Sequence, residues 1–457
     1  MKICPLSPES GFPCRSSDLS DADGPVTRYT SLASYFLILA ATLLFGQAHP
    51  SIHQLQAEEH AQDQDFRTDK VPIRLGLEVL FTDSLHLIQD QSVALVTNHT
   101  GKDHSGTPNY QLLLATPNVR LKVIFSPEHG LFGEAAAGEA VRYGEEMKAL
   151  PPVISLYGKT RKPTPDMLGG VDLILYDIQD IGARFYTYIS TLGLVMEAAG
   201  AQHIPVIVLD RPNPLTGARI DGPVLNPEYQ SFVGYYPIPI QYGLTVGELA
   251  RMMLDRGWID TPPNLTVIPV EHWTRRLWLD ETDLPWIPPS PNIPDLETAT
   301  VYPGMCLFEG TNVSEGRGTD HPFQWIGAPW IDGRTWSQTL MKEKLPGIEF
   351  RPITFTPVDL PGRAMNPKYE GQICGGVALT IVDRNVFRPV ETAVTMLTVL
   401  RRLYPDTFQV KTAWMNKLWG GNKLSRYLEE PVRHDALDWK DEIEDFSKKS
   451  DPFRLYK

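Results

Sequence analysis

The feature that most constrains the fold is a series of short apolar runs that alternate with stretches of helical length. Residues 92–98 (SVALVTN) and 171–177 (VDLILYD) are almost unbroken in apolar character. Strands buried on both faces have this composition, because helices cover both faces of a parallel sheet. Similar runs occupy residues 121–127, 152–157, 204–210 and 265–270. Helical stretches such as 188–202 and 245–257 separate them, which predicts right-handed βαβ units in a parallel, doubly wound sheet.

The texture of the chain changes after about residue 275, where a proline-rich crossing segment begins. An apolar run at 375–383 and a helical stretch at 391–405 follow it. A chain of 457 residues is also longer than one hydrophobic core usually organises. We therefore predict an N-terminal α/β domain over residues 73–275 and a smaller C-terminal α/β domain over 276–457.

The N-terminal region has a targeting signature. Residues 35–45 (YFLILAATLLF) form an apolar run of the length of a signal-peptide core, too short to span a bilayer comfortably. We predict that residues 1–47 are a signal peptide or N-terminal anchor with an over-extended start, and that 48–72 are a flexible leader. The expected location is periplasmic or secreted, with membrane contact only if the segment stays uncleaved.

Charge and motif content exclude several function classes. The net charge is -13, from 55 acidic and 42 basic residues, which argues against nucleic acid as the main partner. No GxGxxG follows the first strand and no CxxC or His/Cys spacing indicates zinc, so we expect no cofactor. Cys306 and Cys374 follow the leader and are either free or paired.

Polar residues gather where the predicted strands end. In an open parallel sheet, ligands bind outside the C-terminal ends of the strands. Each group alone is typical of a turn, but turns do not need Glu, His, Gln, Arg and Tyr together, so this edge is predicted to be a binding cleft. The residues concerned are Asn98, Glu128, His129, Asp177, Gln179, Asp180, Arg184, Tyr186, Asp210, Arg211 and Asn213.

Two glutamates are candidates for acid–base chemistry. Glu128 lies in FSPEHGLFG beside Phe125, Leu131 and Phe132, and apolar neighbours favour the protonated form that a general acid needs. The alternatives are that Glu128 caps a helix or pairs with an arginine. Glu248 is the second candidate, but it has the spacing of a capping box with the threonine three residues before it.

The segment 308–323 (FEGTNVSEGRGTDHPF) is a further candidate for binding. It carries Glu309, Asn312, Glu315, Arg317 and His321 among glycines. A solvated loop would have the same composition. Phosphate binding is disfavoured, because the segment has no GK[ST] and its acidic residues would repel the ligand.

These residues leave three functions open. A glycosidase needs an acid, usually a second carboxylate, and polar or aromatic groups for sugar hydroxyls. A metal-dependent hydrolase would use His99, His104, His129 or His321 with Asp177 and Asp210. A non-catalytic sugar-binding protein would also place two α/β domains around a cleft.

Long segments of the chain resemble one family. SPEHGLFGE, DIQDIGARFYTYISTL, LDRPNPLTG, PSPNIP and YPGMCLFEGTNVSEGRGTDHPFQWIGAPW are similar to the NamZ-type exo-β-N-acetylmuramidases, which are glycosidases of peptidoglycan recycling. The likeness runs from about residue 75 to the C-terminal region. It implies a Rossmann-like N-terminal domain, a smaller C-terminal α/β domain and an active-site cleft at their interface.

The resemblance also implies an activity and roles for residues. The expected reaction releases N-acetylmuramic acid from the non-reducing end of peptidoglycan fragments, such as muropeptides or disaccharides. Glu128 is the implied general acid, Glu248 the second carboxylate, and His129 orients the acid or binds substrate. We expect residues 177–188 and 309–319 to form opposite walls of the sugar site, with Arg184 or Arg317 on the lactyl carboxylate. Substrate contacts are also expected from Asn98, Tyr186, Asp210, Arg211, Asn213, Asn292, Glu309 and Glu315.

Overall fold

The computed structural model describes residues 70–135, 149–429 and 437–457, and residues 68–457 form one compact unit. The predicted signal segment and all but the last three residues of the predicted leader lie outside the described residues. Of those three, Val71 pairs with Thr282 in an isolated parallel bridge. In the described ranges no helix has the length and apolar character needed to cross a membrane.

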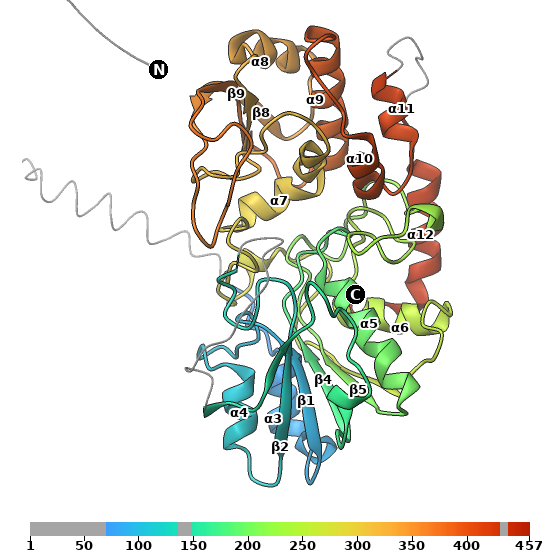
Figure 1. The fold of residues 1–457 in the computed structure, drawn as a ribbon. Coiled ribbons are helices and arrows are strands. Elements are labelled where there is room, and N and C mark those ends of the chain that lie inside the picture. The colour runs from blue at the N-terminus through green and yellow to red at the C-terminus, as the bar shows by residue number, and fades with distance from the viewer. Residues whose placement is uncertain (1–69, 136–148, 430–436) are drawn as a thin grey trace, which may run out of the picture. The chain divides into compact units, whose positions relative to one another are not determined.

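The first part of the unit is a parallel sheet of six strands in the order β3-β2-β1-β4-β5-β6 (Figure 1). Every neighbouring pair is parallel. The strands are β1 Ser92–Thr97, β2 Arg120–Ser126, β3 Val153–Ser155, β4 Leu173–Asp177, β5 Val206–Leu209 and β6 Leu265–Ile268. This order is that of the Rossmann fold, so the predicted parallel, doubly wound sheet is confirmed.

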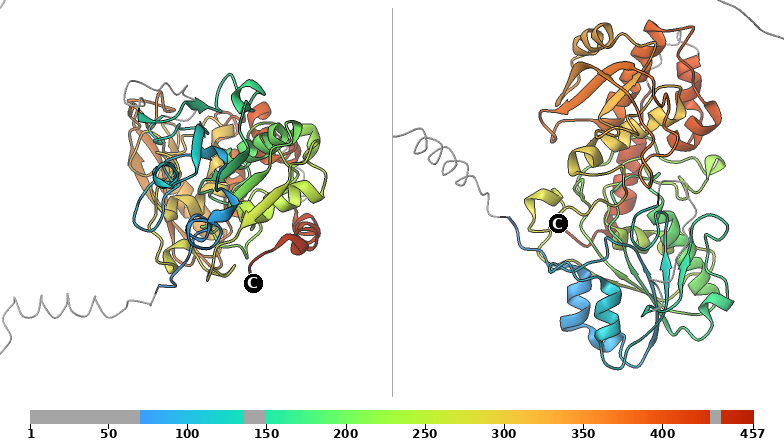
Figure 2. Two further views of the ribbon diagram at one scale, coloured as in Figure 1. Left: turned by 90° about the horizontal axis from the view of Figure 1, so that it is seen from below. Right: turned by 60° about the vertical axis from the view of Figure 1, so that its left-hand side comes forward.

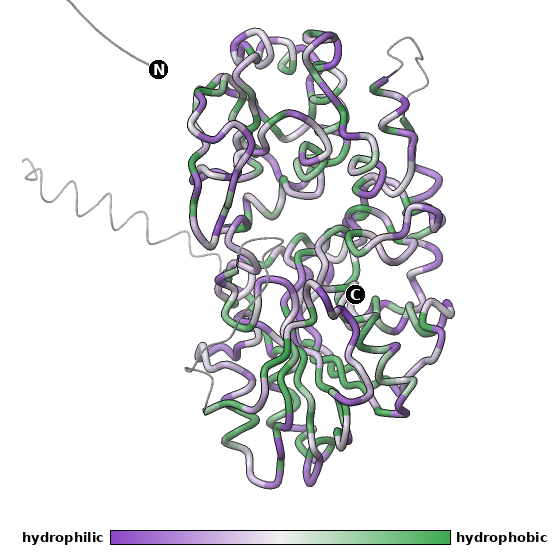
Figure 3. Tube along the Cα trace, in the orientation of Figure 1, coloured by the Kyte–Doolittle hydropathy of each residue, from purple (hydrophilic) through white to green (hydrophobic). Residues whose placement is uncertain are grey.

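Helices cover both faces of this sheet (Figure 2). On one face Val93 and Leu95 of β1 pack in a core with residues of α3 and α4. On the other face Ala94 and Val96 pack with residues of α5 and α6. The helices are α3 Gly76–Asp83, α4 Asn109–Ala115, α5 Tyr188–Ala201 and α6 Val246–Asp255. The strands β1, β4 and β5 are therefore buried along their length, and Figure 3 shows the apolar character of the sheet, because helices keep water from both faces.

The second part contains an antiparallel sheet of three strands in the order β7-β9-β8. Its strands are β7 Trp325–Ala328, β8 Ile348–Phe355 and β9 Cys374–Ile381. Helices surround it in Figure 1, and α8 and α9 carry buried apolar residues of the same core as β9. The helices are α7 Leu296–Met305, α8 Gly333–Lys342, α9 Pro389–Leu403, α10 Thr412–Trp419 and α11 Lys423–Glu429.

Local sequence sets where several of these helices begin and end. The Asp295 side chain caps α7 by accepting from the backbone N–H of Thr298, which satisfies a helix donor that has no partner within the helix. Helix α10 ends at Gly420, whose φ of 77° is left-handed and favours glycine. These two helix ends lie close to the pocket residues of the second part.

The two parts share one core and are joined by the chain's end. The core that contains Ala94 also contains Met305 and Met415 of the second part. After α12, Lys440–Ser450, the chain returns to the first sheet, where the Tyr456 hydroxyl donates to the Asp210 carboxylate at 2.6 Å. Leu279, beyond residue 275, also packs in the core of that sheet. The unit therefore has extensive contacts between its parts.

Candidate active site

A pocket of about 580 Å³ lies between the edge of the parallel sheet and the second part. Residues from the first part line it after strands β2, β3, β4 and β5. Residues from the segment before α7, from α7 and α10, and from the segments between these helices complete it. Its polar lining residues include Glu128, His129, Tyr157, Arg161, Thr187, Ser231, Ser290, Asn292, Glu309, Arg317 and Lys417. The pocket is thus at the C-terminal edge of the sheet, as predicted for this topology.

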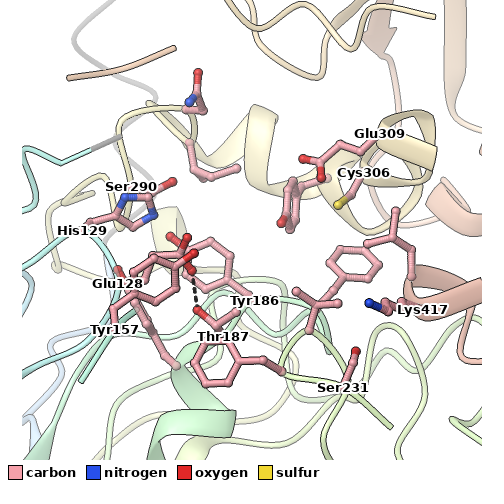
Figure 4. A pocket seen from close by; sticks show the side chains of 18 of the residues that line it. Glu128, His129, Tyr157, Tyr186, Thr187, Ser231, Ser290, Cys306, Glu309 and Lys417 are labelled. Carbon is pink, nitrogen blue, oxygen red and sulfur yellow. Dashed lines mark hydrogen bonds between the residues drawn. The ribbon is translucent and has the colours of Figure 1, made fainter. Parts of the chain in front are cut away.

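Glu128 reaches the pocket because strand pairing ends just before it. Ser126 is the last residue of β2 that pairs with β3, and Pro127 has no N–H to continue the ladder. The half-buried Glu128 carboxylate accepts a hydrogen bond from the Thr187 hydroxyl at 2.8 Å. Figure 4 shows this contact at one side of the pocket. Because Thr187 directly precedes α5, the helix fixes the orientation of the carboxyl group.

His129 is held in a strained backbone conformation beside Glu128. Its φ is 70°, a left-handed value that is uncommon for a residue other than glycine. Its Nδ1 donates to the carbonyl of Ala135 at 2.7 Å. Burial lowers the pKa of His129, although the nearby Glu128 carboxylate opposes the shift. The ring is therefore neutral near pH 7 and adds no positive charge next to Glu128.

The apolar surroundings expected for Glu128 are only partly present. Phe125 and Leu131 are fully buried, as predicted, but Phe132 is 41% exposed. The reason is that the chain turns after Leu131, with Gly133 at a positive φ of 75°. Phe132 therefore points away from the core instead of shielding the carboxyl group.

The opposite wall carries a network of charged residues. Glu309 and Arg317 form an ion pair at 2.7 Å, and Arg317 also approaches Glu315 at 3.6 Å. Lys368 completes the network at 2.9 Å from Glu315. Burial opposes the charged form of Arg317, but the Glu309 and Glu315 carboxylates raise its pKa above the ordinary value. The network therefore pairs two carboxylates with two cationic side chains.

Cys306 lines the same wall but is chemically quiet. Burial, followed by the negative charge of Glu309, raises the pKa of its thiol well above the ordinary value, so no reactive thiolate forms near neutral pH. Cys306 and Cys374 are both free and buried. The open question of whether they pair is answered: they do not.

Comparisons with known proteins bear on this pocket. Residues 93–297 match the family described as "Exo-beta-N-acetylmuramidase NamZ, N-terminal", and residues 300–456 match its C-terminal counterpart. The chain belongs to the NamZ family of exo-β-N-acetylmuramidases. It is 40% identical over 425 residues to the peptidoglycan β-N-acetylmuramidase NamZ of Bacillus subtilis, covering 92% of this chain and 99% of that protein.

Two solved structures of Bacteroides fragilis proteins, both described as DUF1343 family proteins, have the same fold. One has a TM-score of 0.77 and 35% identity, covering 85% of this chain and all of that one (100%). The other has a TM-score of 0.69 and 31% identity, covering 84% of this chain and 99% of the other. The resemblance to the NamZ family inferred from sequence motifs is confirmed.

Four of the substrate residues predicted for this NamZ-family protein line the pocket: Tyr186, Asn292, Glu309 and Arg317. Asn292 is 2% exposed, and its Nδ2 donates to the Arg363 carbonyl at 2.6 Å. Its Oδ1 accepts no hydrogen bond from the described residues. Residues 177–188 and 309–319 both contribute to the pocket, but mainly through Phe185–Tyr188 and the Glu309–Arg317 pair.

The other predicted substrate residues do not line this pocket, because their side chains form hydrogen bonds and ion pairs within the protein. Asp177 forms a buried ion pair with Arg211 at 2.5 Å. Asp180 accepts from the hydroxyl of Tyr242. The residues in this group are Asn98, Asp177, Gln179, Asp180, Arg184, Asp210, Arg211, Asn213, Asn312 and Glu315. Glu315 stands behind the wall, where it holds Arg317 and Lys368.

Arg184 has the largest structural role in this group. It is fully buried and donates to four carbonyls, those of Pro223, Ile238, Leu418 and Trp419. These acceptors belong to a loop of the first part and to the end of α10. Arg184 therefore joins the two parts of the unit, and it is not among the residues that line the pocket.

The structure favours the capping alternative for Glu248. Its carboxylate is fully buried, accepts from the Thr245 N–H at 3.0 Å in a capping box, and pairs with Arg275 at 2.5 Å. It also accepts from the N–H of Leu455 at 2.7 Å. Glu248 is not among the residues that line the pocket. Its contacts hold the start of α6 and the chain's end.

The histidines of the metal hypothesis are dispersed in the structure. His99 contacts the carbonyl of Pro288, His104 contacts Glu78 and Asp283, and His321 stacks on Trp325. Across residues 70–135, 149–429 and 437–457, no group of three or more His, Cys, Asp or Glu side chains is arranged to hold a metal ion. His129 lines the pocket, but it belongs to no such group among the described residues.

Sequence reasoning missed several residues of the pocket. Arg161 stacks over the Phe232 ring at 4.2 Å, and Tyr157 lies on the same ring with centroids 6.1 Å apart. Trp414 and Lys417 enter from α10. Tyr157 and Arg161 lie at the end of the apolar run 152–157 and directly after it, where a strand was predicted, but α10 has no motif that distinguishes it from an ordinary amphipathic helix.

Proposed function

We propose that this NamZ-family β-N-acetylmuramidase releases N-acetylmuramic acid from the non-reducing end of peptidoglycan fragments, with Glu128 as the general acid. The observation that carries the proposal is the position of Glu128, which lies in the pocket at the edge of the sheet. The Thr187 hydroxyl orients its carboxylate through a hydrogen bond of 2.8 Å. Acid catalysis requires a proton at the glycosidic oxygen while the bond from that oxygen to the sugar C1 breaks.

The surroundings of Glu128 support this role. Thr187 fixes one carboxyl oxygen, and the neutral ring of His129 supplies no cation that would favour the ionised carboxylate. The Glu128 carboxyl group is thus oriented to donate a proton to the leaving glycosidic oxygen. His129 acts in the proposal as a positioning residue, since its Nδ1 is committed to the Ala135 carbonyl.

Glu309 is the second carboxylate of the proposal, in place of Glu248. It lies across the pocket from Glu128 (Figure 4), and its ion pair with Arg317 suits a group that remains negatively charged. A fixed negative charge stabilises the positive charge that develops on the sugar ring in the transition state. Tyr157 and Phe232 supply aromatic surface in the same pocket.

Two disaccharides of opposite sequence test the activity and its direction. The purified protein is incubated with N-acetylmuramyl-N-acetylglucosamine and with N-acetylglucosaminyl-N-acetylmuramic acid. Release of free N-acetylmuramic acid from the first substrate alone is expected, because only there is muramic acid at the non-reducing end. Cleavage of both substrates would contradict the selectivity for muramic acid at the non-reducing end. Binding without turnover of either would favour the sugar-binding alternative.

We further propose that the protein is exported to the periplasm or the exterior, where peptidoglycan lies. The apolar run at residues 35–45 and the small residues after it support export. N-terminal sequencing of protein from native cells should begin after residue 45. An intact Met1 on soluble cytoplasmic protein would refute this proposal.

A further inference from the structure

The charges of the pocket separate into a balanced set and an unbalanced set. The balanced set is the network of Glu309, Glu315, Arg317 and Lys368, in which two carboxylates face two cations. Arg317 has a carboxylate on either side, so an anionic ligand group would have to displace one of them. Arg317 is therefore poorly placed to bind a further carboxylate.

The unbalanced set consists of Arg161 and Lys417, which also line the pocket. Within the described part of the chain, neither side chain forms an ion pair or a hydrogen bond; each instead contacts an aromatic ring. The Arg161 guanidinium lies 4.2 Å from the centroid of Phe232, and the Lys417 ammonium lies 5.8 Å from that of Trp414. A ring holds a cation by its face and leaves the N–H donors available.

Both cations are within the same pocket as the proposed acid. The loop that carries Arg161 begins next to Glu128, because the Leu156 N–H donates to the Ser126 carbonyl at 2.7 Å. Lys417 lies across the pocket from Glu128 in Figure 4. A sugar that presents its glycosidic oxygen to Glu128 would therefore share the pocket with two cations that form no ion pair with any described residue.

We infer that Arg161 and Lys417 bind the carboxylate of the lactyl group and so select N-acetylmuramic acid over N-acetylglucosamine. The inference rests on the proposed function, since the lactyl group is the only difference between these two sugars. Arginine binds a carboxylate through two parallel hydrogen bonds, and lysine adds a second positive charge. The assignment replaces the expectation for Arg184 and Arg317, because both Nη atoms of Arg184 donate to backbone carbonyls and Arg317 already pairs with two carboxylates.

The group that these two cations bind is a carboxylate, and peptidoglycan fragments with muramic acid can supply a carboxylate in two ways. Bare muramic acid carries the lactyl carboxylate itself. In peptide-bearing muramic acid that carboxyl is an amide, and the carboxylates lie farther along the peptide. The lactyl source is the one proposed here, because both cations line the sugar pocket itself.

The test compares three substrates with one double variant. The substrates are N-acetylmuramyl-N-acetylglucosamine, the same disaccharide with its lactyl carboxyl converted to a neutral amide, and a peptide-bearing form. Arg161→Gln/Lys417→Gln should lower kcat/KM on the free acid by roughly 10- to 100-fold, the usual loss for a hydrogen bond to a charged group. Activity on the neutral amide should stay within about twofold of the wild type, because it has no charge to lose.

Two controls separate recognition from folding. Lys162→Gln removes an exposed neighbouring cation that pairs with Glu197 at 3.0 Å outside the pocket, and it should leave all three rates unchanged. Arg161→Lys/Lys417→Arg keeps both charges and should retain most of the preference for the free acid.

The outcomes are distinct. An unchanged ratio of acid to amide in the double variant would overturn the inference while leaving the proposed function intact. A loss confined to the peptide-bearing substrate would also overturn it, because the cations would then bind the peptide. A wild type that cleaves no muramide would overturn the proposed function, and this inference with it.

Discussion

Replacing Arg184 with glutamine should destabilise the fold without altering recognition of the sugar. The side chain is fully buried and donates to four carbonyls. The Ile238 carbonyl also accepts a hydrogen bond from the N–H of Leu225 at 3.1 Å, so it keeps a partner in the variant. The other three carbonyls lose the hydrogen bond that Arg184 donates. At about 1 kcal/mol for each buried acceptor, the free energy of unfolding should fall by about 3 kcal/mol.

Urea unfolding followed by tryptophan fluorescence measures this loss. With a slope of about 1–3 kcal/mol per molar urea, the midpoint should fall by about 1 M or more. Arg276→Gln is the matched control, because Arg276 is exposed and such surface changes usually stay within about 0.5 kcal/mol. A stable Arg184→Gln protein with a weakened preference for muramic acid would refute the reasoning, since Arg184 would then act in recognition.

Three further predictions concern buried groups and the chemistry. Burial raises the pKa of Asp180 to about 6, so the folded chain keeps the carboxyl proton to a higher pH than the unfolded chain. The free energy of unfolding therefore falls as pH rises from about 4 to 6. Asp180→Asn should remove the contribution of Asp180 to this pH dependence, which is about 3 kcal/mol between pH 4 and 7. Unfolding curves at these two pH values measure it, and an unchanged pH dependence would contradict the prediction. Glu248→Gln should cost about 3–5 kcal/mol by leaving Arg275 buried and unpaired, while kcat of the folded fraction stays at the wild-type value; a selective loss of kcat would restore its catalytic role. Muramidase activity should survive EDTA, because the proposed acid is a carboxyl group, and a loss reversed by one metal would show otherwise.

The strands of the first sheet could be predicted from sequence because burial on both faces leaves a composition with few alternatives. Runs such as 92–98 and 204–210 match β1 and β5 to within two residues. Strands β7 and β8 were not predicted. β8 alternates buried and exposed residues and contains Pro352, so its apolar pattern is weak.

The position of Glu128 was predictable for the same reason, since it follows a strand that ends at a proline. The neighbouring strand ends were misleading, because Asp177, Asp180 and Arg184 have the composition of a ligand site but bind other parts of the chain. Which polar residues turn inward depends on partners far away in the sequence. Lys417 could not be predicted, because contacts between residues far apart in the sequence, such as those of Arg184 with the Leu418 and Trp419 carbonyls, hold the end of α10 at the pocket.

The most direct test of the account is the dependence of Glu128→Gln on the leaving group. General acid catalysis contributes about 10²–10⁴-fold, so kcat on N-acetylmuramyl-N-acetylglucosamine should fall by that order in a protein that remains folded. On a nitrophenyl muramide the loss should be much smaller, because nitrophenolate leaves without a proton. Equal losses on both substrates, or a folded variant with the wild-type rate on the disaccharide, would contradict the assignment of Glu128 as the acid.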